Sequence, residues 1–320
     1  MSVTLAVSII NYRTPDLTIG AVQSVRDELG DRDAMVVIVD NASGDGSPET
    51  IAEWLSDTGD QRLSLIRSGD NSGFSGGHNQ GMAACPDADF YLILNSDAVL
   101  RPGFFDAILD AAGAAPDAGL IAPRLEDEDG VVQTSCFRFA SAASELERAA
   151  ASGPVSRLLR HHVVALPPSP APETIGWASF ACILLRGDMV REIGPMDEGY
   201  FLYFEDAEYG LRARQAGWGV RYAPDARAVH FRGGSGPVKA LHAAKKRLPR
   251  YFWRSRTRFF RQAHGLFGPL MANLAWMLGR GLAASRRLVG RETPPPHEQE
   301  WRDIWTGFLH PLAPNREGRT

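Results

Sequence analysis

Cysteine is scarce in this chain of 320 residues, and the three that occur, Cys85, Cys136 and Cys182, show no paired short spacing. This pattern excludes the common zinc-binding and disulfide frameworks and fits a reducing compartment. The N-terminus lacks the basic segment of a secretory signal peptide, so we expect its apolar run to form a first strand. No GxGxxG sequence follows that strand, which disfavours an NAD-dependent oxidoreductase.

Acidic residues are missing from residues 239–291, which hold 13 Lys and Arg and no Asp or Glu. The rest of the chain holds 21 basic and 38 acidic residues, so the net charge of −4 combines a basic segment with an acidic globule. A basic segment of this kind predicts contact with an anionic surface. We expect no nucleic-acid partner, because the acidic globule would repel a polyanion lying across it.

An uninterrupted membrane span is missing as well. Residues 262–279 carry no formal charge when His264 is neutral, but Pro269 and Asn273 interrupt the run. The preceding sequence, YFWRSRTRFFR (residues 251–261), interleaves aromatic and arginine residues. We therefore predict interfacial helices, with arginines toward anionic headgroups and aromatic side chains toward the acyl boundary. Two alternatives stay open, namely helices that pack on the rest of the chain or that form a homodimer.

Short apolar runs alternate with helical stretches in the first part of the chain. The predicted buried strands are residues 3–11, 35–39, 63–66 and 90–94. This alternation predicts an α/β fold with a mostly parallel central sheet flanked by helices. Ser, Ala and Pro interrupt the pattern from about residue 131 to 172, which predicts a variable or mobile insertion. Apolar strand-like runs return at 175–185 and before His230.

Polar side chains stand where three of these strands end. Asn11, Asp40 and Asp97 occupy the carboxyl ends, where sheets of this kind bind ligands. The glycine-rich sequence NSGFSGGHNQG (residues 71–81) predicts a loop whose backbone N–H groups approach a phosphate or sugar. Asp97, together with diphosphate oxygens and His230, would suit Mn²⁺ or Mg²⁺. The alternatives are a turn-forming role for Asp40 and a structural role for His230.

The sequence FLYFEDAEYGLRARQAGW (residues 201–218) places two acids after four apolar residues and at the start of a helical pattern. Burial beside apolar residues raises the pKa of a carboxylate, while a helix N-terminus lowers it. A carboxylate set in this way, Glu205 or Asp206, could take a proton from a hydroxyl group. Taken alone, the pair is also compatible with an ordinary helix N-cap.

Six motifs in order resemble those of the family 2 inverting glycosyltransferases, and within them the rhamnosyltransferase-like branch. They are VSIINYRT (7–14), VIVDNASGDGS (37–47), NSGFSGGHNQG (71–81), LILNSDAVL (92–100), GPMDEGYFLYFEDAEYGLRARQAGW (194–218) and VHFRGGS (229–235). The similarity covers roughly residues 3–260. It implies the GT-A fold, a nucleotide-sugar donor (a dTDP- or UDP-sugar) and a divalent cation, Mn²⁺ or Mg²⁺.

The resemblance also implies roles for single residues. Asp206 matches the catalytic base, with Glu205 as the adjacent candidate, and Asp97 matches the last acid of a DxD-type metal motif. Asn95 stands at the first position of that motif, and His230 stands where the family has a metal-contacting histidine. The residues expected to bind the nucleotide sugar are Asn11, Tyr12, Arg13, Asp40, Asn41, Ser43, Gly73, Phe74, Gly76, Gly77, Asn79, Asn95, Ser96 and Asp97, with Trp177 and Phe204 on the acceptor side.

The implied reaction is a single displacement at the anomeric carbon, with inversion, assisted by a base and by a metal at the leaving diphosphate. Similarity to the branch favours dTDP-L-rhamnose as the donor, with UDP-galactofuranose or another deoxysugar as alternatives. The acceptor is expected to be a glycan or a lipid-linked glycan. A non-catalytic carbohydrate-binding protein on the same scaffold is the competing hypothesis.

The chain is predicted to divide into a GT-A catalytic domain, residues 1–238, and a basic helical C-terminal extension, residues 239–320. Within the first, nucleotide-sugar binding is expected in about 1–125, and the acceptor site and base in about 173–238. The predicted location is cytoplasmic, at the inner face of the membrane, through peripheral contact by residues 239–291.

Overall fold

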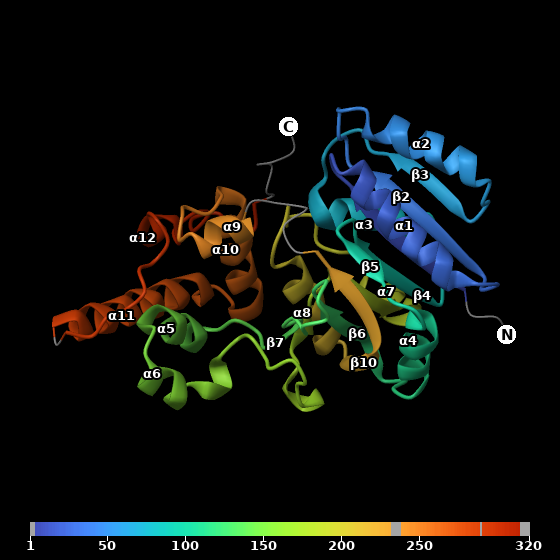
Figure 1. Cartoon of the computed structure of the whole chain (residues 1–320). Helices are drawn as coiled ribbons and strands as arrows, with labels where there is room; N and C mark the ends of the chain where they lie inside the picture. The colour runs from blue at the N-terminus through green and yellow to red at the C-terminus, as the bar shows by residue number, and fades with distance from the viewer. Residues whose placement is uncertain (1–3, 232–237, 289, 314–320) are drawn as a thin grey trace.

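The computed structural model describes residues 4–231, 238–288 and 290–313, so residues 232–235 of the last motif lie outside the described part. Figure 1 shows a sheet with helices on both of its faces and, beside it, a separate group of helices from the C-terminal part of the chain. The helices of residues 142–158 lie next to that C-terminal group, although the two segments are far apart in the sequence.

Eight strands form the central sheet. They are β1 (Leu5–Asn11), β2 (Ala34–Asp40), β3 (Leu63–Arg67), β4 (Phe90–Asn95), β5 (Ala98–Leu100), β6 (Ala118–Glu126), β9 (Cys182–Arg186) and β10 (Gly219–His230). Their order is β3-β2-β1-β4-β9-β6-β10-β5. The strands from β3 to β4 are parallel, as are β6 and β10, while β9 and β5 run antiparallel to their neighbours. The predicted α/β fold with a mostly parallel sheet is confirmed.

Alternate side chains of β4 supply two buried clusters, one on each face of the sheet. Leu92 and Leu94 join the first cluster, and Tyr91 and Ile93 join the second. The first cluster includes residues of α1 (Pro15–Leu29), α2 (Ser47–Thr58) and α4 (Phe104–Gly113). The second includes residues of α3 (Gly73–Ala83), α7 (Gly187–Ile193) and α8 (Glu205–Gln215). Both faces are therefore covered by helices.

The glycine-rich sequence at 71–81 predicts a loop, and this prediction is wrong, because helix α3 begins at Gly73. A side chain added at Gly81 would overlap Ser8 of β1, so the helix lies directly on the strand. Gly73 itself has a φ of +72°, and a side chain there would meet the carbonyl group of Phe201. The glycines therefore allow close packing of a helix on its neighbours, which a pattern of small residues does not distinguish from a flexible loop.

The predicted insertion, about residues 131–172, contains regular structure. It forms β7 (Cys136–Phe137), which pairs with β8 (Trp177–Ala178), then α5 (Ala142–Ala150), α6 (Gly153–Leu158) and short 3₁₀ turns at Arg160–His162 and Pro172–Thr174. Ser141 caps α5 and accepts a hydrogen bond from the backbone N–H of Ser144. This helix packs against the C-terminal extension.

The extension contains α9 (Val238–Ala243), α10 (Arg250–His264), α11 (Gly268–Leu288) and α12 (Glu300–Asp303). Two ion pairs join it to α5: Arg256 contacts Glu145 at 2.9 Å, and Glu300 contacts Arg148 at 2.7 Å. Arg148 also contacts Glu145 within α5 at 2.6 Å, and of these four side chains only Arg148 is partly exposed. Removing one partner from such a cluster is costly, because the remaining buried charge is uncompensated. In the part of the chain that the structure describes, no helix combines the length and apolar character that a bilayer span requires.

Candidate active site

The carboxyl ends of β1 and β2 carry a closed set of hydrogen bonds. Asn11 lies opposite Asp40 in the parallel register, and its amide donates to Asp40 Oδ1 at 2.7 Å. The Ser43 hydroxyl donates to the same oxygen at 2.6 Å and accepts from the backbone N–H of Arg13 at 3.0 Å. The structure thus brings together four residues predicted to bind the nucleotide sugar. Beside them Tyr12 is half-buried and Arg13 is exposed.

Two predicted asparagines hold neighbouring segments in place. Asn41 accepts from the backbone N–H of Ser72 and donates to the carbonyl of Gly73, both at 3.0 Å, which ties β2 to the start of α3. Asn79 bonds to both backbone groups of Met196, at 2.9 and 3.0 Å. The other predicted residues of this segment, Phe74, Gly76 and Gly77, lie on the first turns of α3. Asn79 therefore joins helix α3 to the segment that leads into the acidic pair.

The turn after β4 places a carboxylate beside a histidine. Asn95 ends β4, Ser96 and Asp97 lead into β5, and His230 pairs with Ala98 in the antiparallel register. His230 Nε2 lies 3.4 Å from Asp97 Oδ1, and Asp97 is 1% exposed. Among the described residues, no group of three or more His, Cys, Asp and Glu could hold a metal. The converging carboxylate and imidazole still suit Mn²⁺ or Mg²⁺, provided that phosphate oxygens and water complete the coordination.

Glu205 and Asp206 are the first two residues of α8. Glu205 is 6% exposed, and its Oε2 has no hydrogen-bond partner among the described residues. Burial raises the pKa of Glu205 well above its usual range, and the charge of Asp206 adds to the effect. Burial also raises the pKa of Asp206 to about 7, although the backbone N–H groups of Ala207 and Phe180 stabilise its charged form. A carboxyl group with such a pKa is suited to proton transfer at neutral pH.

The loop that presents these acids is strained. Tyr203 and Phe204 have φ values of 71° and 70°, where a residue other than glycine costs about 1–3 kcal/mol. The Tyr203 ring stacks on Tyr251, with centroids 6.5 Å apart, and the Phe204 ring packs on Phe252 at 5.6 Å. Both partners belong to α10, so the extension holds the strained loop in place.

These contacts correct the prediction for residues 251–261, whose aromatic side chains were assigned to an acyl boundary. Trp253, Phe259 and Phe260 are at most 2% exposed, and Arg256 is 2% exposed and paired with Glu145. These three aromatic residues and Arg256 therefore face the protein interior on α10, while the other aromatic and arginine side chains of the segment are half-buried. Of the alternatives left open by the sequence, packing on the catalytic domain is the one that the structure has for this helix.

An ion pair forms a second link between α10 and the segment before the acids. Arg258 donates to Asp197 Oδ2 from two nitrogens, at 2.8 and 2.9 Å. Gln262 donates to the same oxygen at 2.8 Å and accepts from the hydroxyl of Tyr200. Burial alone would raise the pKa of Asp197, but hydrogen bonds from Gln262, the Gly199 amide and Arg258 outweigh it and lower the pKa. We predicted no role for these side chains, although Arg258 and Gln262 stand four residues apart on one helix face.

The two residues predicted on the acceptor side lie in one apolar cluster with α8 and α10. The Trp177 ring stacks on Phe137 at 4.3 Å, and its N–H donates to the carbonyl of Arg138 at 3.0 Å. Gly210 of α8 leaves room for the Trp177 Cβ. Both Trp177 and Phe204 are half-buried, and their contact with an acceptor stays a prediction.

The Tyr203 ring belongs to the strained loop before α8 and carries a buried hydroxyl group. Burial is the main cause that raises the pKa of its hydroxyl, followed by the charges of Tyr251, Glu205, Asp206 and Asp97. The backbone links the two ends: Asp206 accepts from the N–H of Phe180, and the next residue, Ala181, accepts from the backbone N–H of Asn95 at 2.9 Å, so the acidic pair and the turn that carries Asp97 border one region. The sequence analysis did not single out Tyr203, although it stands two residues before Glu205 within the FLYFED motif.

Comparison with solved structures identifies the fold. A mannosyltransferase from Pyrobaculum calidifontis, in complex with GDP-Man and Mn²⁺, matches with a TM-score of 0.56 and 15% identity, over 98% of this chain and 85% of that chain. S. aureus TarS 1-349 matches with a TM-score of 0.52 and 13% identity, over 98% and 80% of the two chains. These neighbours are GT-A glycosyltransferases, and the chain has the GT-A fold.

Comparison of sequences identifies the family. The model for glycosyl transferase family group 2 matches residues 91–290, and that for glycosyl transferase family 2 matches residues 6–139. The chain therefore belongs to the family 2 glycosyltransferases, as the motifs predict. It is 29% identical over 279 residues to an N-acetylglucosaminyl-diphospho-decaprenol L-rhamnosyltransferase of Mycobacterium tuberculosis (strain CDC 1551 / Oshkosh), covering 82% of this chain and 85% of the relative. A low-salt glycan biosynthesis hexosyltransferase, Agl10 of Haloferax volcanii, is 24% identical over 204 residues, or 62% and 59% of the two chains.

Proposed function

We propose that this glycosyltransferase moves L-rhamnose from dTDP-L-rhamnose to a hydroxyl group of a lipid-linked glycan, with inversion at the anomeric carbon. The observation that carries the proposal is the pair of buried Glu205 and half-buried Asp206, which follows a strained loop and borders the Asp97–His230 end of the sheet. The choice of sugar and acceptor is supported by the similarity to the mycobacterial rhamnosyltransferase over most of both chains.

Asp206 is proposed as the catalytic base. It takes the proton of the acceptor hydroxyl while that oxygen bonds to the anomeric carbon, and the bond from carbon to the diphosphate oxygen breaks with its electron pair. Glu205 is more deeply buried and its pKa is raised well above its usual range, so we assign it a protonated, positioning role beside Asp206. The strain at Tyr203 and Phe204 fixes the approach of the two acids.

The donor is proposed to bind at the carboxyl ends of β1, β2 and β4. Asp40 and its partners shape the pocket for the nucleoside, and the exposed Arg13 provides positive charge for the diphosphate. Asp97 and His230 would hold a divalent cation, which supplies Lewis-acid stabilisation of the leaving diphosphate when bound. The mannosyltransferase neighbour binds Mn²⁺ with GDP-Man, which favours such a cation without fixing its identity.

A panel of donors tests this assignment. We expect nucleotide release from dTDP-L-rhamnose that depends on an acceptor and exceeds release from UDP-galactofuranose by at least about tenfold. EDTA should abolish it, and Mn²⁺ or Mg²⁺ should restore it. Preference for UDP-galactofuranose or another deoxysugar donor would replace rhamnose as the transferred sugar, and full activity in excess EDTA would remove the cation from the proposal.

The competing hypothesis, a non-catalytic protein, predicts a different result. If every donor remains intact while glycan binding is measurable, the protein is a carbohydrate-binding module on a transferase scaffold.

The expected division of the chain into a catalytic part, residues 1–238, and an extension, residues 239–320, is also a proposal. The contacts between α10 and the loop before α8 indicate that the catalytic part needs its extension.

A further inference from the structure

Helix α11 exposes an apolar face along its length. Met271, Leu274, Met277, Leu278 and Leu282 are between 40% and 59% exposed and recur mostly at spacings of three and four residues. The exposed residues of this helix from 271 to 285 include no charged side chain. An uncovered apolar patch of this extent on a protein surface marks a site of interaction.

The opposite face of α11 already has its partners. Ala272, Trp276 and Ala283 are at most 3% exposed, and Gly279 lies against the backbone of Leu146 on α5. The helix is therefore apolar on both sides, with one side used for packing within the protein. The exposed side is not needed for that packing.

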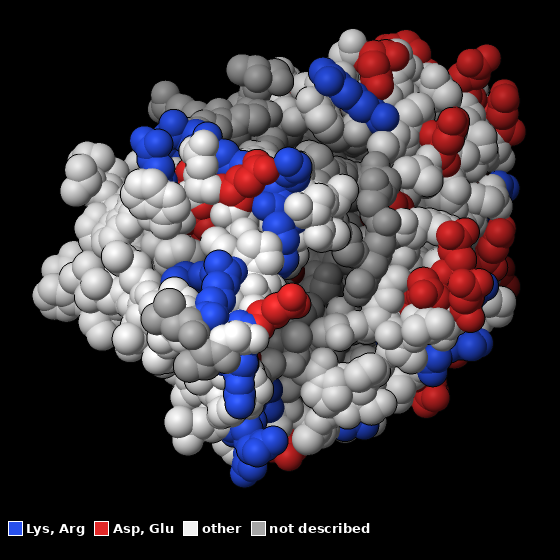
Figure 2. Space-filling model, turned by 60° about the vertical axis from the view of Figure 1, so that its left-hand side comes forward, with Lys and Arg blue, Asp and Glu red and all other residues white. Residues whose placement is uncertain are grey.

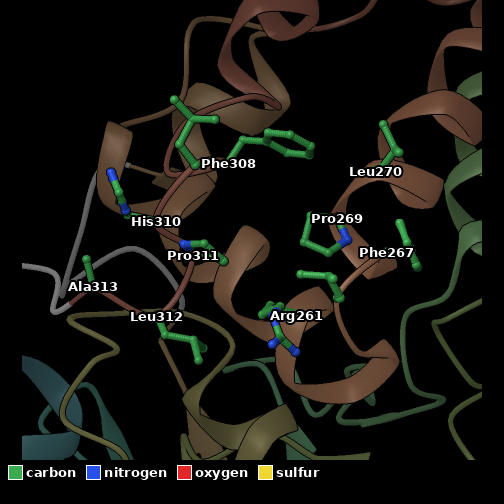
Figure 3. A pocket seen from close by; sticks show the side chains of 11 residues that line it. Arg261, Phe267, Pro269, Leu270, Phe308, His310, Pro311, Leu312 and Ala313 are labelled. Carbon is green, nitrogen blue, oxygen red and sulfur yellow. The ribbon is translucent and has the colours of Figure 1, made fainter.

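The apolar face continues into the turn before α11. Leu266 and Phe267 are 70% and 67% exposed there. They border a cavity of about 720 Å³, whose other side is formed by the C-terminal segment with Phe308, Leu309 and Leu312 (Figure 3). None of the residues proposed for catalysis or donor binding lines this cavity. The turn and the cavity thus extend the apolar face of α11 rather than the active site.

Positive charge borders this face. Arg280 and Arg286 donate to main-chain carbonyl groups of Ala149 and Ala151, and Arg287 donates to Thr293. Within the described part of the chain, no ion pair joins these three arginines to a carboxylate, although the charge of Glu300 acts on Arg280. Figure 2 shows wide uncharged areas and most of the Lys and Arg side chains on the left of this view, and Asp and Glu mainly on the right.

We propose that the exposed face of α11, with Leu266 and Phe267, docks on an anionic lipid bilayer. The apolar side chains would enter the boundary between headgroups and acyl chains, and Arg280, Arg286 and Arg287 would meet the headgroups. A second copy of the chain fits less well, because two-fold pairing across this face would bring the arginines of both copies together. The inference narrows the predicted membrane contact, residues 239–291, to the exposed face of α11 and the turn before it.

This docking rests on the proposed function in one respect, namely that a lipid-linked acceptor resides in a bilayer. The face is joined to the catalytic loop through α10, since Arg258 of that helix contacts both Asp197 and the carbonyl of Leu312 at the cavity. An enzyme docked in this way would hold its base at a fixed height above the membrane.

Vesicle flotation tests the inference without any turnover. The full chain should float with vesicles of phosphatidylcholine and phosphatidylglycerol, and less with phosphatidylcholine alone. The double variant Leu274→Glu with Leu278→Glu should lose at least about tenfold in bound fraction, because two charges would have to enter the apolar boundary. The matched control is Met35→Glu with Val131→Glu, which adds the same charges at exposed apolar positions outside this face and should float like the unchanged protein.

Both double variants should retain transfer to a short, water-soluble acceptor, which shows that they fold. If the unchanged protein stays at the bottom of the gradient, or if the α11 variant floats equally well, the inference is overturned. A dimer in sedimentation that the α11 substitutions dissociate would assign the face to a second copy instead. Flotation without transfer from any donor would remove the proposed function and leave the docking surface standing.

Discussion

The polar groups at the two ends of the candidate site differ in whether they have hydrogen-bond partners within the protein. Where β1 and β2 end, Asn11, Asp40 and Ser43 bond to one another, and all three are at most 3% exposed. Before α8, the strained loop presents Glu205 and Asp206, and burial raises the pKa of both. The first end contributes to the stability of the fold, whereas the second requires stability from elsewhere, as is common where residues act on a substrate.

The ends also differ in what supports them. The end formed by β1 and β2 is held by neighbouring loops of its own βα units, with Asn41 bonding to Ser72 and Gly73. The loop before α8 rests on α10, which lies about fifty residues further along the chain, and α10 in turn pairs with α5. One end of the site is therefore stabilised by segments that are close in the sequence, and the other by segments that are far away in it.

The largest expected effect is that of Asp206→Asn on turnover. We expect kcat to fall by about 10²–10⁴, because the acceptor hydroxyl loses its base, while the affinity for dTDP measured by calorimetry stays unchanged. Asp40→Asn is the counterpart at the other end, and it should weaken dTDP binding. Near-normal turnover of Asp206→Asn, with Glu205→Gln inactive, would transfer the role of base to Glu205.

Arg258→Ala tests whether the loop before α8 depends on the C-terminal extension. The substitution leaves Asp197 without its paired charge, so we expect a loss of about 1–3 kcal/mol in unfolding free energy and about a tenfold lower kcat with the donor KM unchanged. Arg258→Lys should recover part of this loss, since one ammonium group replaces a two-nitrogen contact. The matched control is Arg302→Ala on α12, an exposed arginine outside this network. Equal effects of Arg258→Ala on KM and kcat would make α10 a general support of the fold.

The placement of polar residues at the strand ends could largely be predicted from the sequence. Buried strands are short apolar runs, and a polar residue directly after such a run falls at the ligand-binding edge of a parallel sheet, which located Asn11, Asp40 and Asp97. The family motifs then marked Glu205 and Asp206. These features depend on neighbours along the chain or on residues that the motifs contain.

The rest depends on contacts between distant segments. Helix α3 was predicted as a loop, because the sequence does not show that Gly81 packs on Ser8 of β1. The aromatic residues of α10 suggested a membrane contact, because an amphipathic helix with arginines has the same pattern whether its apolar face meets lipid or protein. The strain at Tyr203 and the ion pair of Asp197 with Arg258 leave no local signature in the sequence.

A third expected effect concerns the dependence of stability on pH. In the folded protein the pKa of Asp206 is about 7, above the usual 3.8, so the folded state binds more protons than the unfolded state between about pH 4 and 7. The contribution of Asp206 to stability is therefore present at low pH, falls as pH rises through this window and levels off above about pH 7. Glu205 acts in the same direction, because burial and the charge of Asp206 raise its pKa too.

Asp206→Asn removes this titration, so at pH 8 the variant should be more stable than the unchanged protein, by up to about 4 kcal/mol. At pH 4 the two should unfold at similar urea concentrations, because Asp206 is then largely protonated in the folded protein. Asp40→Asn provides the contrast, since it weakens a hydrogen-bonded network and should lose about 1–3 kcal/mol at both pH values. If Asp206→Asn also destabilises the protein at pH 8, charged Asp206 does not lower the stability of the fold. The acids of α8 and the residues at the ends of β1 and β2 would then both contribute to stability.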